Sequence, residues 1–187
     1  MNQIINTFSK FGFAGNDLTE IAEYFSLKRY KSGEFFIQNG FVADYLGFVN
    51  QGIFQFYFDD NGDEKTTYMA LKGDVIVSVQ SFFAGLQSKE NVKALVEAEV
   101  WIIKKSDFIK LIDNISGFKE FYISVLEHLL VCIDESRFDY ITLSPDERYA
   151  KLMKNEPELL QQVPLKYLSA LIGITPRHLS RIRKNIK

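Results

Sequence analysis

The cationic side chains near the end of the sequence have types and spacing that suit contact with a nucleic acid. From Pro164 onward the chain carries six Lys or Arg residues and no acidic residue. Arginine can donate two parallel hydrogen bonds to a guanine edge, and both cations pair with phosphates. The candidate DNA-binding residues are Thr175, Arg177, His178, Ser180, Arg181, Arg183 and Lys184. Among them, Arg177, His178 and Arg181 are expected to contact bases.

The local pattern around these cations predicts two helices joined by a tight turn. Leu168 and Leu171 belong to an apolar face on a first helix, and Gly173 permits a turn that a bulkier residue would resist. Thr175 and Pro176 form a helix start, with a capping residue followed by proline at the first position. This pattern is typical of a helix-turn-helix, whose second helix enters the major groove. An ordinary basic helical hairpin is the alternative.

The charge of the chain is unevenly distributed. Residues 144–187 hold nine Lys or Arg against four Asp or Glu, a net charge of +5. Residues 1–143 hold thirteen against twenty, a net charge of −7, and the two parts sum to the overall −2. This asymmetry indicates a nucleic-acid-facing end on an acidic body. The alternative for a run of like charge is a solvated face.

Short aromatic or β-branched runs separated by glycines extend from about residue 30 to Lys105. The Asp60-Asn61-Gly62 sequence between two of these runs predicts a hairpin, because Asn-Gly supplies the positive φ angles of a tight turn. Short strands at such spacing predict a β-sandwich or barrel. The carboxylates clustered at the hairpin are interpreted as a solvated turn rather than a metal site. Helices are predicted over residues 16–27, before the strands, and 106–115, after them.

A long helix is predicted from Gly117 to about Asp139. One set of its side chains alternates four and three apart, the period of a coiled-coil seam: Phe118, Tyr122, Val125, Leu129 and Cys132. We therefore expect a dimerisation helix and a homodimer, with a helix buried wholly in one chain as the alternative. Cys132 is the only cysteine, which excludes an intrachain disulfide and a cysteine-ligated zinc site.

The order of these parts resembles the Crp/Fnr superfamily of bacterial transcription regulators. The stretches that carry the resemblance are YKSGEFFIQNG, ADYLGFVNQGIFQFYF, DDNGDEKTTYMALKGD and LSALIGITPRHLSRIRK. The resemblance implies an α+β fold: a jelly-roll-like β-roll with flanking helices (residues 1–115), a dimerisation helix (116–142) and an all-α helix-turn-helix domain (143–187). No strand pair follows Lys187, so the usual wing is expected to be absent. Double-stranded DNA is the implied partner, and RNA polymerase is a candidate.

The same resemblance locates an effector pocket and argues against cyclic AMP or cyclic GMP. Members that bind cyclic nucleotides have a Gly-Glu pair for the ribose and an Arg-Ser/Thr-Ala stretch for the phosphate. Here Val77-Ser78 and Ser88-Lys89-Glu90 occupy those places. The pocket candidates are therefore Ser78, Ser88 and Lys89. An unknown small-molecule effector or none is expected.

Other cofactors and functions find little support. An iron–sulfur cluster needs several cysteines, and neither His128 nor His178 is well placed as a haem ligand. No metal site is expected. The sequence has no nucleophile elbow, zinc-protease motif, P-loop or dinucleotide turn, so we do not expect an enzyme. No apolar run reaches the length of a membrane helix, and the cytoplasm is the expected location. A regulatory or protein-interaction module of the same roll, without DNA binding, is the alternative function.

Overall fold

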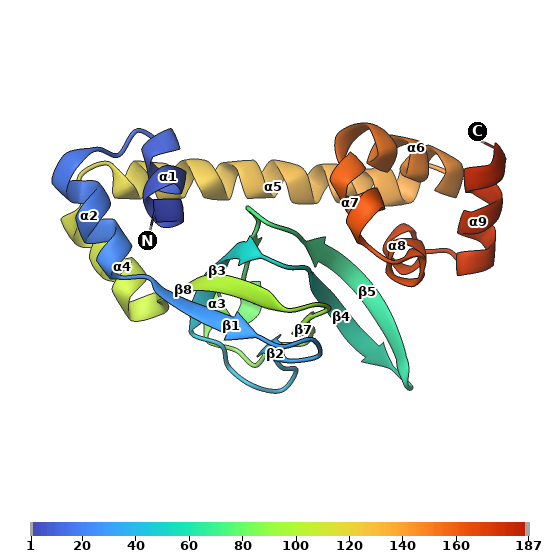
Figure 1. Ribbon diagram of the computed structural model, residues 1–187, viewed down its shortest axis with the longest axis horizontal. Helices are drawn as coiled ribbons and strands as arrows, with labels where there is room; N and C mark the ends of the chain where they lie inside the picture. Colours follow the sequence, from blue (N-terminus) through green and yellow to red (C-terminus); the bar gives the residue numbers. More distant parts are fainter. Residues whose placement is uncertain (1, 186–187) are drawn as a thin grey trace.

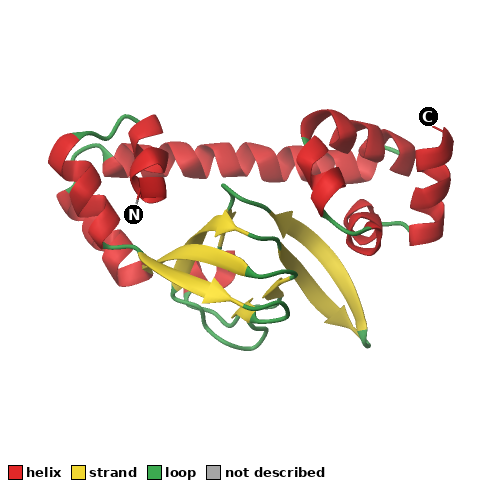
Figure 2. Ribbon diagram, viewed as in Figure 1, coloured by secondary structure: helices red, strands yellow, loops and turns green. Residues whose placement is uncertain are grey.

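The computed structural model describes residues 2–185. Met1, at the start of the first predicted domain, and Ile186 and Lys187, at the end of the last one, lie outside the described residues. A long helix, α5 (Phe118–Thr142), runs along the molecule above a β-roll (Figure 1). Short helices gather at both of its ends, and strands occupy the space below it (Figure 2). The predicted α+β class, with a roll, a long helix and a C-terminal helical part, is confirmed.

The roll consists of two antiparallel four-stranded sheets, in the orders β1-β8-β3-β6 and β2-β7-β4-β5. Aromatic and β-branched residues on alternate positions point between the sheets and form the interior of the roll, including Phe54 and Val100, which are both fully buried. The strands are β1 (Ser26–Tyr30), β2 (Phe35–Ile37), β3 (Tyr45–Gln51), β4 (Phe54–Asp60), β5 (Asp63–Ala70), β6 (Val75–Ile76), β7 (Asn91–Ala94) and β8 (Ala98–Lys104).

The predicted hairpin joins β4 to β5. Asn61 and Gly62 have φ angles of +54° and +93°, as the two-residue turn requires. The amide of Gly62 donates to the carboxylate of Asp59 at 2.9 Å, and Glu64 of β5 forms an ion pair across β4 with Lys93 of β7. These carboxylates therefore serve the hairpin and its sheet.

The remaining helices flank the roll. They are α1 (Asn2–Lys10), α2 (Gly15–Glu23), α3 (Val79–Ala84), α4 (Lys105–Asn114), α6 (Pro145–Asn155), α7 (Pro157–Gln162), α8 (Leu165–Ile172) and α9 (Pro176–Asn185). The helix predicted over 16–27 ends earlier, at Glu23, because strand β1 begins at Ser26. None of the helices in the described part of the chain is long and apolar enough to cross a membrane.

Phenylalanine rings attach the N-terminal helices and α4 to the start of α5. The ring centroids of five other phenylalanines lie 5.6–6.0 Å from that of Phe8. Such close offset or edge-to-face pairs add to the stability that burial gives. The high phenylalanine content of the sequence therefore reflects this helical cluster as well as the strands.

Helix α6 begins with a reciprocal cap. The hydroxyl of Ser144 accepts from the amide of Glu147, and the Glu147 carboxylate accepts from the amide of Ser144 at 2.8 Å. Pro145 occupies the first helical position. This reciprocal capping separates α6 from α5 and starts the C-terminal group of helices.

Candidate nucleic-acid interface

The predicted helix-turn-helix is formed by α8 and α9 (Figure 1). Gly173 joins the helices with a φ of +78°, a conformation that glycine adopts without strain. The amide of Ile174 donates to the carbonyl of Ser169 at 2.9 Å and closes the end of α8. The hydroxyl of Thr175 accepts from the amide of His178 at 3.2 Å and caps α9. The turn and the cap thus have the structure that the sequence predicts.

One face of α9 is fixed in an apolar core. Leu179 and Ile182, three residues apart, are fully buried, and buried Ser169 lets α8 and α9 cross closely. The remaining faces carry the predicted DNA-binding residues of the helix. Its exposed cations are Arg177, Arg181, Arg183 and Lys184, whereas His178 and Ser180 are half-buried.

The exposed cations of α9 keep their hydrogen-bonding capacity. Within residues 2–185, none of them forms an ion pair with an acidic side chain. The hydroxyl of Thr175 accepts the capping hydrogen bond, so its own hydrogen remains a donor. The structure therefore gathers the predicted residues on and beside one helix, with donors available to an anionic partner.

The predicted effector pocket has a different arrangement. Ser78 and Ser88 are buried and lie together, with the hydroxyl of Ser78 donating to that of Ser88 at 3.1 Å. The hydroxyl of Ser88 donates in turn to the carbonyl of Glu90 at 2.8 Å. Both hydroxyl hydrogens are thus used within the chain, whereas Lys89 is exposed. The structure brings the two serines together but leaves the lysine outside.

A carboxylate stands next to this serine pair. The side chain of Glu90 accepts from the hydroxyl of Thr67 at 3.1 Å, which joins residues 78–90, the effector turn, to strand β5. Burial raises the pKa of Glu90 above its ordinary value, and the hydrogen bond from Thr67 opposes that shift. A cyclic phosphate placed here would meet a negative charge instead of the arginine that it needs.

The predicted seam on α5 lies mostly against the chain itself. Phe118 is fully buried in the phenylalanine cluster, and its predicted role in dimerisation is therefore corrected to packing within one chain. Tyr122 packs on Phe108 with ring centroids 5.3 Å apart, and Val125 is half-buried. Leu129 is 44% exposed, and exposed Cys132 lies 3.5 Å from His128.

A second apolar strip on α5 faces solvent. Ile123, Leu130 and Ile133 are 45–66% exposed, and half-buried Leu126 continues the same four-three spacing. This strip has the same period as the predicted seam and lies one position away from it. The two strips differ in the aromatic pair Phe118 and Tyr122, whose rings pack on phenylalanines of α1 and α4.

The roll is similar to a known domain family. Residues 27–114 match the cyclic nucleotide-binding domain family. The structure resembles FixK2 from Bradyrhizobium japonicum with a TM-score of 0.73 and 16% identity, over 87% of this chain and 84% of that one. The catabolite activator protein of Thermus thermophilus gives a TM-score of 0.59 and 19% identity, over 94% and 84% of the two chains.

A third structure carries the family name. It is described as a transcriptional regulator of the Crp/Fnr family from Eubacterium rectale, and matches with a TM-score of 0.68 and 15% identity over 97% of this chain and 87% of that one. This chain has the Crp/Fnr fold. Comparison with curated proteins gives no match in sequence. The Crp/Fnr fold accounts for the order of the roll, α5 and the helix-turn-helix.

Proposed function

We propose that this chain is a sequence-specific DNA-binding transcription regulator of the Crp/Fnr type. The observation that carries the proposal is the state of α9, whose apolar face is locked in a core while its cations stay exposed. Phosphates of duplex DNA would replace the water around these cations and release counterions. The Crp/Fnr fold supports the proposal, since solved structures of that fold include transcriptional regulators.

The residues of α9 divide into two roles. Arg177, His178 and Arg181 are proposed to contact base edges in the major groove, where arginine reads guanine. The proposed phosphate contacts are Thr175, Arg183 and Lys184. Ser180 lies beside the base-reading residues. The acidic body of the chain would repel other stretches of DNA and leave α9 as the surface of approach.

We propose that the regulator acts as a homodimer through α5. The exposed strip of Ile123, Leu130 and Ile133 would be covered by the same strip of a second copy. A two-fold dimer would read an inverted repeat whose half-sites lie about 34–36 Å apart. In sedimentation equilibrium, Leu130→Asp with Ile133→Asp should yield monomers, because each charge would be buried against an apolar surface. Dimers of unchanged affinity would contradict this interface.

The roll is proposed to bind neither cyclic AMP nor cyclic GMP. The hydroxyl of Ser78 donates to that of Ser88, which donates to the backbone carbonyl of Glu90, and the Glu90 side chain adds a carboxylate to the same segment. Calorimetric titration with either nucleotide should give no heat of binding, and micromolar affinity would contradict the proposal. We further propose that the chain uses no haem or iron–sulfur cluster and is not an enzyme.

Selection from random DNA duplexes tests the central proposal. The full-length protein should enrich one motif with two-fold symmetry, and Arg177→Ala with Arg181→Ala should abolish the enrichment. If the wild-type protein enriches no motif, the DNA-binding proposal fails. The same roll acting as a regulatory or protein-interaction module would then be the better account.

A further inference from the structure

The core of the C-terminal helices is completed by residues of the roll. One apolar cluster joins Leu168, Ile172 and Leu179 of the helix-turn-helix to Ile53 and Met69 of the roll. Met69 is only 1% exposed and Ile53 is 7% exposed, so both are covered by the helices. The C-terminal helices, α6 to α9, form a unit too small to bury a full apolar core alone. The helix-turn-helix is therefore attached to the roll through shared core packing.

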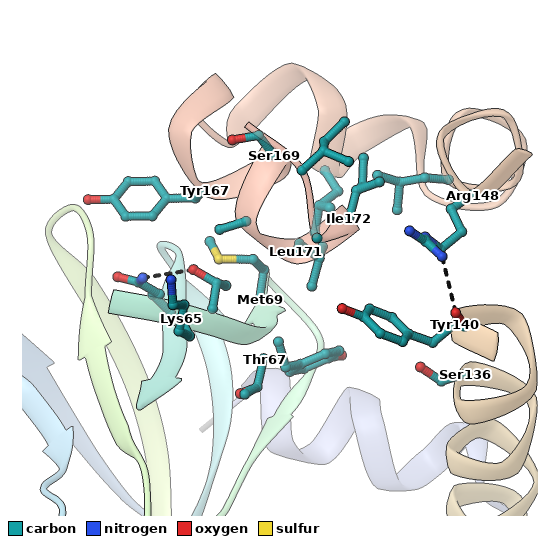
Figure 3. A pocket seen from close by; sticks show the side chains of 18 of the residues that line it. Lys65, Thr67, Met69, Ser136, Tyr140, Arg148, Tyr167, Ser169, Leu171 and Ile172 are labelled. Atoms are coloured by element: carbon teal, nitrogen blue, oxygen red, sulfur yellow. Dashed lines mark hydrogen bonds between the residues drawn. The ribbon is translucent and has the colours of Figure 1, made fainter. Parts of the chain in front are cut away.

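The attachment uses the outer face of the sheet that contains β4 and β5. Residues on that face alternate with those that fill the roll, so Met69 points away from the roll interior. Helix α8 lies on β5, and Figure 3 shows Met69 approaching Leu171 and Ile172 between the two elements. Partly buried Leu71 and Leu95 extend the contact. This is the first of two attachments.

The second attachment is at the end of α5. Nη1 of Arg148 on α6 donates to the carbonyls of Tyr140 at 3.2 Å and Leu143 at 2.8 Å. The guanidinium carbon of Arg148 also lies 4.9 Å from the centre of the Tyr140 ring (Figure 3). Lys151 of α6 forms an ion pair with Asp139. Together these contacts fix the direction in which α6 leaves α5.

Tyr140 also reaches the turn of the helix-turn-helix. A Cβ atom built on Gly173 would lie 2.9 Å from the Tyr140 hydroxyl, so the turn and the tyrosine are in close contact. An open groove lined by Thr67, Ser136 and Tyr167 lies between β5, α5 and α8 (Figure 3). The two attachments are thus separate, and they hold the helix-turn-helix from different sides.

We propose that Met69 and Tyr140 are positioning residues for DNA recognition, holding α9 in one orientation without any effector. The proposal rests on the proposed DNA binding and dimerisation. A unit held at one point can rotate about it, whereas separate contacts to the roll and to α5 remove that freedom. In a dimer joined through α5, a fixed orientation sets the distance between the two copies of α9. The structure of the chain, and not an effector, would then determine the spacing of the two half-sites.

The test is selection on duplexes that carry two half-sites separated by spacers of different length. The full-length dimer is used with no small molecule added, and native mass spectrometry verifies that none is bound. The wild-type protein is expected to prefer one spacer length at least tenfold over its neighbours. Tyr140→Ala, combined with Met69→Ala, is expected to reduce that preference to about twofold and to leave the bases chosen in each half-site unchanged.

Two conservative variants provide the matched controls. Met69→Leu keeps an apolar side chain of similar volume. Tyr140→Phe loses the hydroxyl but keeps the ring over Arg148 and the ring carbons that a Cβ atom on Gly173 would meet at 3.5 Å. Both should retain the wild-type spacer preference. Since Tyr140 is 62% exposed, Tyr140→Ala alone removes little buried surface and should unfold at the wild-type temperature. This single variant keeps the test valid if the double variant does not fold.

Each other outcome contradicts the proposal. An unchanged spacer preference in Tyr140→Ala and in any folded Met69→Ala protein would show that neither residue positions α9. A wild-type protein that selects a half-site but no spacer would show that the orientation is free. Binding that needs a copurified or added small molecule would show that the orientation is not fixed by the chain. Only the absence of any half-site motif would contradict the proposed DNA binding as well.

Discussion

The effector turn and helix α9 both present polar side chains, but they differ in what those side chains bond to. In the effector turn, the hydroxyl of Ser78 donates to that of Ser88, and the hydroxyl of Ser88 donates to a backbone carbonyl inside the chain. On α9, Arg177 and Arg181 are exposed and, in the part of the chain that the structure describes, form no ion pair. Satisfied polar groups stabilise their own chain, whereas unsatisfied exposed donors remain available to a partner. The difference separates a structural turn from the proposed binding surface.

The largest effect that the comparison predicts is on DNA affinity. Arg177→Ala with Arg181→Ala should weaken specific binding by about 2–6 kcal/mol, at about 1–3 kcal/mol for each base-reading arginine. Thermal unfolding should be unchanged, because both side chains are exposed. Fluorescence anisotropy with the selected duplex measures the change. The control is Lys28→Ala with Lys72→Ala, which removes the same charge from exposed positions of the roll. An equal loss in that control would mean that overall charge, and not α9, determines binding.

The effector turn should respond in stability. Ser88→Ala removes an acceptor from Ser78 and a donor from the carbonyl of Glu90 within a buried site. The free energy of unfolding should fall by about 1–3 kcal/mol, as measured by urea denaturation. DNA affinity of the folded protein should stay the same. Ser116→Ala, at an exposed position, is the control and should change neither quantity. If Ser88→Ala altered DNA affinity, the turn would be communicating with α9.

A smaller effect is expected when one side chain of α9 that is proposed to bind a phosphate is removed. Lys184→Ala should weaken binding to all duplex sequences alike, because a phosphate carries no base information. The slope of log affinity against log salt concentration should become shallower by about 0.9 for each phosphate that the protein no longer neutralises. Titrations at several salt concentrations measure the slope. A change in the preferred base at one position would instead indicate that Lys184 reads sequence.

The smallest predicted effect concerns the pH dependence of stability. Burial raises the pKa of Glu90 in the folded chain above its ordinary value of 4.5. Its contribution to stability is therefore fully present below pH 4.5 and is lost as the pH rises through the folded-state pKa. Glu90→Gln removes this titration but keeps an acceptor for Thr67, so it should flatten the fall in stability above pH 4.5. An identical pH profile in the variant would show that Glu90 does not contribute.

Local signals in the sequence were sufficient for the hairpin and the helix-turn-helix. Asn61-Gly62 and Gly173 each require a particular backbone conformation, and the structure has both. The cations of α9 were identifiable because the apolar spacing of Leu179 and Ile182 determines which faces remain free. These features depend on neighbours within a few residues of each other.

Features that depend on distant contacts were not predictable in the same way. The two apolar strips of α5 have one period, and contact of Phe118 with the distant rings of Phe8 and Phe13 shows which strip is internal. Likewise, the hydrogen bond between Ser78 and Ser88 depends on how the effector turn folds back. The contact of Met69 with α8 had no local signal, because an apolar residue in a strand can face either side of its sheet.

The shared core also affects the order in which the chain can fold. Ile53 and Met69 belong to one cluster with Leu168 and Ile182, about a hundred positions later in the sequence. During synthesis, the outer face of the roll therefore stays uncovered until α8 has left the ribosome. Contacts between such distant residues form late, and exposed apolar surface favours aggregation in the meantime. A ribosome that pauses before α8 would leave a folded roll with an exposed apolar face, to which a chaperone would bind.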